Sequence, residues 1–209
     1  AKDVELTVEY GGVKDSIEFT RIGAISRSIN KGHNYFSFPG VLNKEYSVKD
    51  VIEAAGQFSV DRTIGDGVES IWTYKNGQWM NYYPSAPQND FNSMEAGQGY
   101  IIDAKENFTT YPVVETNLSR LESNTVVTPA THQITSGWNL IGSYWKNDIS
   151  ANSTEAFNSM PEDTITQVLI SDKDGTIGVK PLESGSITGG RAYWVSAREN
   201  ATYTKSVVN

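Results

Sequence analysis

Aromatic side chains are concentrated in one stretch of the sequence, ESIWTYKNGQWMNYY. If this stretch is extended, alternate positions put Trp79 and Tyr83 on one face of a strand, and Trp72 and Tyr74 on another. Exposed indole and phenol rings combine a flat apolar face with a polar edge, and sugars can stack on them. We therefore predict a carbohydrate-binding surface made by Trp79, Tyr82 and Tyr83. The alternative is that these rings fill the core, since a sheet needs only one buried face.

Two carboxylates alternate in the short segment SDKDG. Asp172 and Asp174 are expected in one tight turn, and carboxylate oxygens are the hard ligands that calcium prefers. The remaining Asp or Asn residues and the final Glu of an EF-hand loop are missing from this segment. Calcium is therefore the one candidate cofactor, and a solvated turn that binds no metal is the alternative.

The tripeptide Asn-x-Ser/Thr, the acceptor for N-glycosylation, occurs four times in the sequence. The candidate residues are Asn107, Asn117, Asn152 and Asn200. Asn107 and Asn200 stand at the same place in two similar phrases, YIIDAKENFT and YWVSARENAT. Glycosylation of an exported chain is one explanation, and a polar turn that matches the tripeptide by chance is the other.

No local group of residues in the sequence indicates catalysis. The two histidines, His33 and His132, lack His, Asp or Glu partners at the spacing of a zinc site or a catalytic triad. The chain has no cysteine, which excludes disulfides, thiolate metal sites and cysteine nucleophiles. Gly97-Gln98-Gly99 precedes a strand pattern instead of opening a helix, so it is predicted to be a turn and not a nucleotide-binding loop. We predict that the chain is not an enzyme.

Charge and hydropathy argue against two classes of partner. The chain has 25 acidic and 17 basic residues and a net charge of −8 at pH 7, with no basic stripe. Such a field repels nucleic acid. No apolar run approaches the roughly 20 residues that a membrane-spanning helix needs. We predict no nucleic-acid partner and no membrane span in this chain.

Two similar series of elements must position the candidate residues. Each contains a strand with a Gly-x-Asn pattern (GHNYF, GWNLI), then a hairpin, and then the strand of the repeated phrases. The hairpin turns are Asn76-Gly77 and Asp174-Gly175, since a type I′ turn needs positive φ at both central residues. A short helix is predicted in SVKDVIEAAG, with Ser47 as its N-cap, and a weaker one in STEAFNSM. Ahead of both series, the alternating strand VELTVEY and the following GG predict an opening hairpin.

These patterns predict a mainly β fold made of two tandem copies of a related module. Each copy is expected to be β-sandwich-like with one short helix. Residues 1–115 are expected to hold the N-terminal strands and the first module, and residues 116–209 the second module. The boundary is placed there because ETNLSRLES is polar and nearly free of strand signal.

Several of these segments together resemble a known family. GHNYFSFPG, VESIWTYKNGQWMNYY and MEAGQGYIIDA, followed by GWNLIGSYW, TQVLISDKDG and ITGGRAYWVSA, are similar to a repeated module of archaeal and bacterial cell-surface and S-layer-like proteins. In that module a GWNLIS strand precedes a hairpin with Trp and Tyr and a PGxGYW strand. The chain departs from the pattern at His33, where the module has Trp, and its second hairpin lacks a counterpart of Trp79. The resemblance implies an extracellular location at the cell surface.

Duplication, the absence of a catalytic group and the many Tyr, Thr, Ser and Asn residues predict a non-catalytic structural protein. We expect a subunit or segment of a surface layer, filament or virion exterior, which assembles with copies of itself or with other surface proteins. The strand VELTVEY would pair along an exposed sheet edge, because main-chain hydrogen bonds tolerate many sequences. The alternative function is a carbohydrate-binding or adhesion module, with calcium as a candidate ligand.

Overall fold

Strands dominate the fold, so the mainly β prediction is confirmed. The computed structural model describes residues 4–10, 13–19, 22–24, 27–37, 45–53, 67–110, 113–115, 131–142, 150–152, 156–171, 177–180 and 186–204. Most described elements belong to two series, which we call the first half (residues 27–110) and the second half (residues 131–204). The remaining strands form an N-terminal group.

The first half is built on a four-stranded antiparallel sheet in the order β5, β10, β7, β8. At the turn between β7 and β8, Asn76 and Gly77 have φ of 54° and 78°, the positive values that a type I′ hairpin requires. Two further strand pairs, β4 with β11 and β6 with β9, complete this half. The bounds are β4 (Arg27–Ile29), β5 (Gly32–Phe36), β6 (Glu45–Ser47), β7 (Val68–Lys75), β8 (Gln78–Tyr82), β9 (Ser93–Glu95), β10 (Tyr100–Ala104) and β11 (Phe108–Thr110).

The second half contains corresponding strands in the same order. Its four-stranded antiparallel sheet runs β14, β19, β16, β17, and its further pairs are β13 with β20 and β15 with β18. The predicted turn Asp174-Gly175 lies outside the described residues, but the strands on either side of it pair as a hairpin. The bounds are β13 (Thr131–Ile134), β14 (Gly137–Gly142), β15 (Ser150–Asn152), β16 (Ile165–Ser171), β17 (Ile177–Lys180), β18 (Ser186–Thr188), β19 (Ala192–Ala197) and β20 (Ala201–Thr204).

The correspondence between the halves extends to register and to individual hydrogen bonds. Both β7–β10 and β16–β19 contain a register shift, and it falls at the same place in the two sheets. Tyr100 begins β10 and its hydroxyl accepts a hydrogen bond from the N–H of Glu95 (2.7 Å). Tyr193 takes the same place in β19 and accepts from the N–H of Thr188 (2.6 Å). The two repeated phrases therefore begin with the same buried tyrosine contact.

The Gly-x-Asn pattern also gives the same local structure twice. Gly32 and Gly137 have φ of 93° and 96°, which glycine adopts without strain. The amide of Asn34 donates to the carbonyl of Gly32 (2.8 Å), and that of Asn139 donates to the carbonyl of Gly137 (3.0 Å). Each Asn Oδ1 also accepts from the backbone N–H four residues earlier. Each Asn side chain therefore holds together the turn that leads into β5 or β14.

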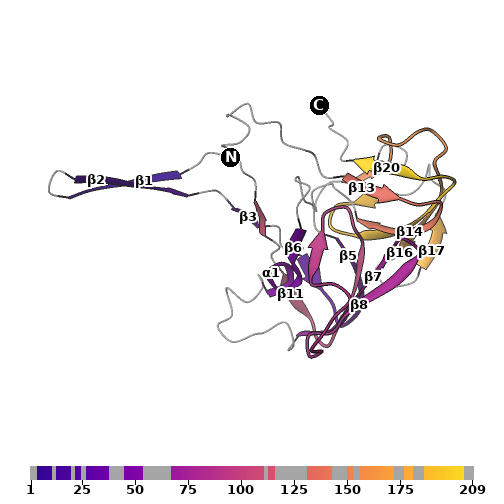
Figure 1. The fold of residues 1–209 in the computed structure, drawn as a ribbon, viewed down its shortest axis with the longest axis horizontal. Coiled ribbons are helices and arrows are strands. Elements are labelled where there is room, and N and C mark those ends of the chain that lie inside the picture. Colours follow the sequence, from indigo (N-terminus) through magenta and orange to yellow (C-terminus); the bar gives the residue numbers. More distant parts are fainter. Residues whose placement is uncertain are drawn as a thin grey trace.

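The N-terminal group contains the hairpin that the sequence predicts. Its strands are β1 (Val4–Tyr10), β2 (Val13–Phe19), β3 (Ile22–Ala24) and β12 (Val113–Glu115). β1 pairs with β2, and β3 pairs with β12. In the register of the hairpin, Leu6 lies opposite Ile17 and Tyr10 lies opposite Val13. Figure 1 shows the hairpin extending away from the two halves as a two-stranded arm.

Of the two predicted helices, the described residues contain the first and one helical residue of the second. α1 (Val48–Glu53) begins directly after Ser47, the predicted N-cap. In the second predicted segment, residues 153–155 lie outside the described residues, Ala156 is helical, and residues 157–160 form a turn closed by a hydrogen bond from Met160 N to Phe157 O (3.0 Å). Because residues 153–155 are not described, the second helix remains a prediction. Pro161 follows directly, and the residue before a proline is biased against helical backbone.

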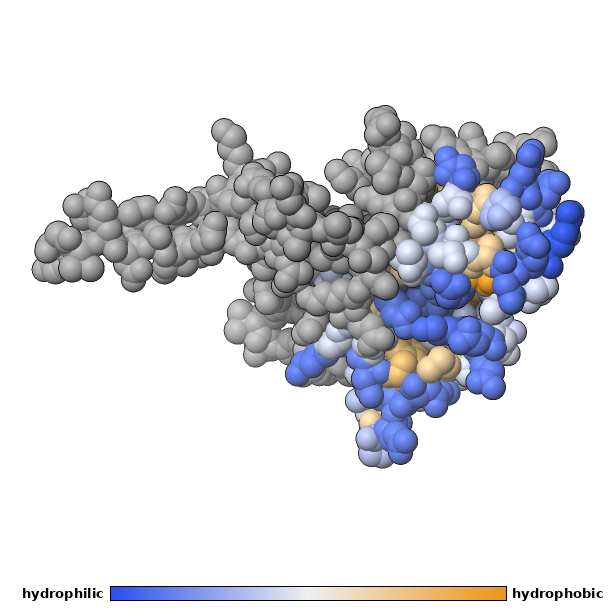
Figure 2. All heavy atoms as spheres, turned by 45° about the horizontal axis from the view of Figure 1, so that its top comes forward, coloured by the Kyte–Doolittle hydropathy of each residue, from blue (hydrophilic) through white to orange (hydrophobic). Residues whose placement is uncertain are grey.

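The core lies on one face of each four-stranded sheet. Ile71 and Ile102 are fully buried in the first sheet, and Val168 and Val195 in the second. Residues of α1 join the same hydrophobic cluster. In Figure 2 the visible described surface is mostly hydrophilic and its hydrophobic patches are small. Burial of these apolar side chains is the main favourable contribution to folding.

The two halves are joined by backbone hydrogen bonds between corresponding segments. Ser37, directly after β5, donates its N–H to the carbonyl of Gly190 (3.1 Å). Gly142, at the end of β14, donates its N–H to the carbonyl of Gly97 (2.8 Å). Leu140 is fully buried (0% exposed) beside this junction. The halves therefore contact each other through the ends of β5 and β14 and the Gly-containing turns before β10 and β19.

Candidate functional site

Four rings of the aromatic hairpin, those of Trp72, Tyr74, Trp79 and Tyr83, lie on one face of the sheet. The β7–β8 register puts Trp79 opposite Tyr74 and Asn81 opposite Trp72. Residues directly opposite each other in an antiparallel pair point to the same face. The prediction that Trp72 and Tyr74 lie on a different face from Trp79 is therefore wrong. Alternation within each strand does not fix how the two strands align across the turn. This alignment is what places Trp72 and Tyr74 on the same face as Trp79.

Trp79 is the centre of a ring cluster that we call the aromatic surface: Trp72, Tyr74, Trp79, Tyr83 and Trp194. The Trp79 ring is 6.3 Å from Trp72, 5.3 Å from Tyr74 and 5.5 Å from Trp194, between centroids and mostly edge to face. Tyr83 lies 6.0 Å from Trp72. Trp79 is 51% exposed and Tyr83 is 37% exposed. Edge-to-face contacts stabilise ring orientation, so Trp79 presents a fixed, half-exposed indole.

The aromatic surface spans both halves because Trp194 comes from β19. The indole N–H of Trp194 also donates to the phenol oxygen of Tyr35 in β5. Burial raises the pKa of Tyr35, and this hydrogen bond partly opposes the rise. Trp138 on β14 is a further exposed indole (40%) and lies opposite Ser196 of β19. Among the described ring contacts, none joins Trp138 to the cluster.

Tyr82, the third predicted sugar-binding residue, lies on the other face of the sheet. It is opposite Ile71, which is fully buried. Its ring is half-buried against the core and lies 6.0 Å from Phe91. Of the three predicted residues, only Trp79 and Tyr83 share an exposed face.

Two of the glycosylation candidates have a structural role in the turns that follow β10 and β19. Oδ1 of Asn107 accepts a hydrogen bond from the N–H of Lys31 (2.7 Å), and Oδ1 of Asn200 accepts from the N–H of Ser136 (2.8 Å). Both Asn residues are exposed. The bonds use the oxygen of each side chain, whereas a glycan is attached through the nitrogen. The repeated Asn therefore has a folding explanation that is also compatible with glycosylation.

The other predicted modification and metal residues are placed only in part. Asn117, Asp172 and Asp174 lie outside the described residues. Asn152 ends β15, where its backbone pairs with Ser186. Within the part of the chain that the structure describes, no group of three or more His, Asp or Glu side chains could hold a metal ion. The calcium prediction at Asp172 and Asp174 remains untested.

The two histidines have very different surroundings. His33 is exposed, and its Nε2 lies 3.9 Å from the Asp103 carboxylate. His132 is buried in β13, and burial together with the positive charge of Lys75 lowers its pKa to about 4. His132 is therefore neutral at pH 7, and it lies in the interior instead of at an exposed reactive site.

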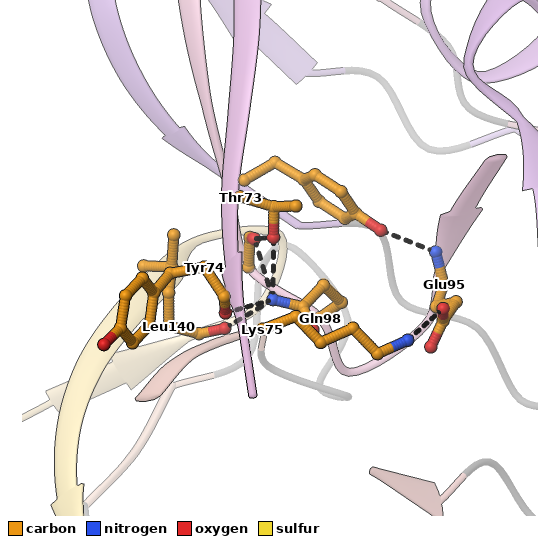
Figure 3. A network of polar contacts seen from close by, with 8 residues as sticks. Thr73, Tyr74, Lys75, Glu95, Gln98 and Leu140 are labelled. Atoms are coloured by element: carbon orange, nitrogen blue, oxygen red, sulfur yellow. Dashed lines mark hydrogen bonds and ion pairs between the residues drawn. The ribbon is translucent and has the colours of Figure 1, made fainter. Parts of the chain in front are cut away.

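Gln98 is the buried polar residue that connects the two halves (Figure 3). It is 1% exposed. Its Nε2 lies 2.8 Å from Thr73 Oγ1 and 3.1 Å from the Tyr74 carbonyl in the first half, and 2.9 Å from the Leu140 carbonyl in the second. Thr73 Oγ1 in turn donates to the Gly99 carbonyl (2.8 Å). One amide therefore provides donors for acceptors on β7 and β14.

Sequence reasoning identified the Gly97-Gln98-Gly99 segment as a turn but missed this role. The turn is confirmed by the φ of 83° at Gly97 and by a hydrogen bond from Gln98 N to Glu95 O (3.3 Å). A single Gln between two glycines gives no local indication of its distant partners. Trp194 was missed as a member of the aromatic surface for the same reason.

Comparisons with known proteins identify no relative. No protein-family model, no curated protein and no solved structure matches the chain. Among the described residues, no helix is long and apolar enough to cross a membrane. The function is therefore argued from the fold and from the surfaces described above.

Proposed function

We propose that the chain is a non-catalytic structural protein of the extracellular surface, part of a surface layer, filament or virion exterior. The observation that carries the proposal is the N-terminal hairpin. Among the described strands, β1 and β2 pair only with each other. A two-stranded hairpin alone is marginally stable in water. Docking on a neighbouring copy or on another surface protein would stabilise it.

The hairpin offers two kinds of contact to such a partner. Each strand has one edge that no described strand covers, so its N–H and C=O groups can extend a neighbour's sheet. The alternating sequence also pairs apolar residues across the hairpin, such as Leu6 with Ile17. Apolar residues in a projecting hairpin favour burial against a partner.

We also propose that the two halves are tandem copies of one sandwich-like module, divided near residue 115. The matching strand orders, register shifts and Asn turns support this duplication. Tandem modules suit a surface protein, because repetition extends a scaffold without a new fold. The resemblance to archaeal and bacterial S-layer-like modules supports the same location.

The assembly proposal predicts that one apolar residue of the hairpin controls self-association. We expect the unmodified chain to form large oligomers as its concentration rises, and Leu6→Asp to shift the midpoint of assembly at least about tenfold, because it replaces an apolar residue of the proposed contact with a charged one. Multi-angle light scattering across a concentration series measures this. Thr7→Asp, at the neighbouring polar position, is the matched control and should assemble normally. A chain that stays monomeric at every concentration would exclude self-assembly through the hairpin.

The second candidate function is carbohydrate binding, favoured by the half-exposed, rigidly held ring of Trp79. Stacking on a fixed indole costs little conformational entropy. Tyr83 would extend the contact on the same face. The acidic chain repels anions on average, so a neutral or amino sugar is the expected ligand.

Trp79→Ala is expected to weaken glycan binding at least about tenfold, since an aromatic anchor of this kind carries about 2 kcal/mol or more. A neutral glycan array followed by calorimetry on the best ligand measures the effect. Trp138→Ala removes an exposed indole outside the aromatic surface and should leave binding unchanged. Equal losses in the two variants, or no ligand for the unmodified chain, would exclude this function.

A further inference from the structure

Corresponding residues of the two halves face each other at the junction. Ser37 follows β5 in the same place that Gly142 takes in β14, and Gly99 precedes Tyr100 as Ala192 precedes Tyr193. Facing of corresponding residues is the geometry of a twofold interface. Ser37 N donates to the carbonyl of Gly190, and Gly142 N donates to the carbonyl of Gly97. These are corresponding hydrogen bonds, one donated by each half.

In each facing pair one residue is glycine, and there is no room for a second side chain. A Cβ at Gly142 would lie 2.5 Å from the Cβ of Ser37 and 2.7 Å from the carbonyl of Gln98. A Cβ at Gly99 would lie 2.8 Å from the Cβ of Ala192, 2.8 Å from the carbonyl oxygen of Ile141 and 2.9 Å from Cγ of Leu140. Neither glycine has positive φ, so space and not backbone conformation requires glycine here. Interiors are packed too densely to absorb such overlaps without a shift.

The glycines are distributed one to each half. The first half carries Ser37 and Gly99, and the second carries Gly142 and Ala192. Two first halves packed in this geometry would put Ser37 against Ser37, and two second halves would put Ala192 against Ala192. Both arrangements repeat a Cβ overlap below 3 Å. Only unlike halves place a side chain opposite a glycine at both positions.

We infer that this junction is a pairing surface that accepts unlike halves and rejects like halves. Its partner is the opposite half of the same chain, or that of a second copy by reciprocal exchange. Rejection of the wrong pairing by steric overlap is a common source of interface specificity. The inference rests on the proposed equivalence of the halves but not on assembly, which must use other surfaces such as the hairpin.

The test exchanges the side chains across each pair in the full chain and measures thermal unfolding at a concentration where the chain is monomeric. Gly142→Ser alone should lower Tm by about 10 °C or more. Adding Ser37→Gly should restore a measurable part of that loss, because it removes the overlap with the Ser37 side chain but leaves the overlap with the Gln98 carbonyl. Adding Ala192→Gly to Gly142→Ser is the matched control and should restore nothing, because Ala192 faces the other glycine.

Gly99→Ala, with and without Ala192→Gly, repeats the test at the second pair. A higher Tm in both double variants (Gly142→Ser with Ser37→Gly, and Gly99→Ala with Ala192→Gly) than in the single glycine variants supports the inference. This holds also if Gly142→Ser alone fails to fold. Double variants that are no more stable than the single glycine variants would overturn the inference. Light scattering of the hairpin variants reports on assembly separately, so failure of one proposal does not imply failure of the other.

Discussion

Replacing Gln98 with methionine is expected to lower the free energy of unfolding by about 2 kcal/mol, because the two N–H donors of a buried amide are lost. Methionine nearly matches the volume of Gln but donates no hydrogen bond. The two N–H groups of the amide are shared among Thr73 Oγ1 and the carbonyls of Tyr74 and Leu140, and the Leu140 carbonyl keeps a second donor, Gly99 N (3.1 Å). Each buried polar atom left unsatisfied costs about 1–3 kcal/mol. Urea unfolding followed by tryptophan fluorescence measures the change.

Two comparisons make the Gln98 prediction specific. Gln78→Met removes the same amide from an exposed position on β8 and should change stability by no more than about 0.5 kcal/mol. Gln98→Glu puts a carboxylate beside carbonyl oxygens, which raises the pKa of the new carboxyl group. Its stability should therefore fall further at pH 7 than at pH 4. A Gln98→Met protein as stable as Gln78→Met would show that the network contributes nothing to holding the halves together.

The parts of the fold that the sequence predicted are those set by local chemistry. Asn76-Gly77 specifies its hairpin because the turn needs positive φ at both residues. Ser47 directly precedes α1, as an N-cap residue does, and the Gly-x-Asn pattern marks the start of a strand at Gly32 and at Gly137. These signals act within a few residues, so one sequence is enough to identify them.

The parts that the sequence did not predict depend on contacts between distant segments. Trp194 joins the aromatic surface only because the second half packs on the first. The Gln98 amide bonds to Leu140, 42 residues away. Trp72 and Tyr74 were assigned to a different face from Trp79 because alternation within each strand leaves the register across the hairpin undefined. The register Lys75 opposite Gln78 follows from a two-residue turn, so that error was avoidable from sequence.

Acidification is expected to destabilise the protein through His132. The pKa of His132 is lowered from 6.5 to about 4 in the folded chain, mainly by burial. As pH falls, the unfolded chain therefore binds the proton first, and protonation favours unfolding. The contribution is fully present above about pH 6.5 and is lost progressively down to about pH 4. The difference between the two pKa values corresponds to about 3 kcal/mol.

Histidine variants separate this effect from the titration of carboxylates in the same range. His132→Gln does not titrate, so its free energy of unfolding should fall less than that of the unmodified chain between pH 7 and pH 4. His33→Gln removes the exposed imidazole and is the control for the loss of one histidine. Urea unfolding at half-unit steps of pH measures all three proteins. Parallel curves for the unmodified chain and His132→Gln would contradict the prediction, because only a buried neutral imidazole couples folding to protonation in this way.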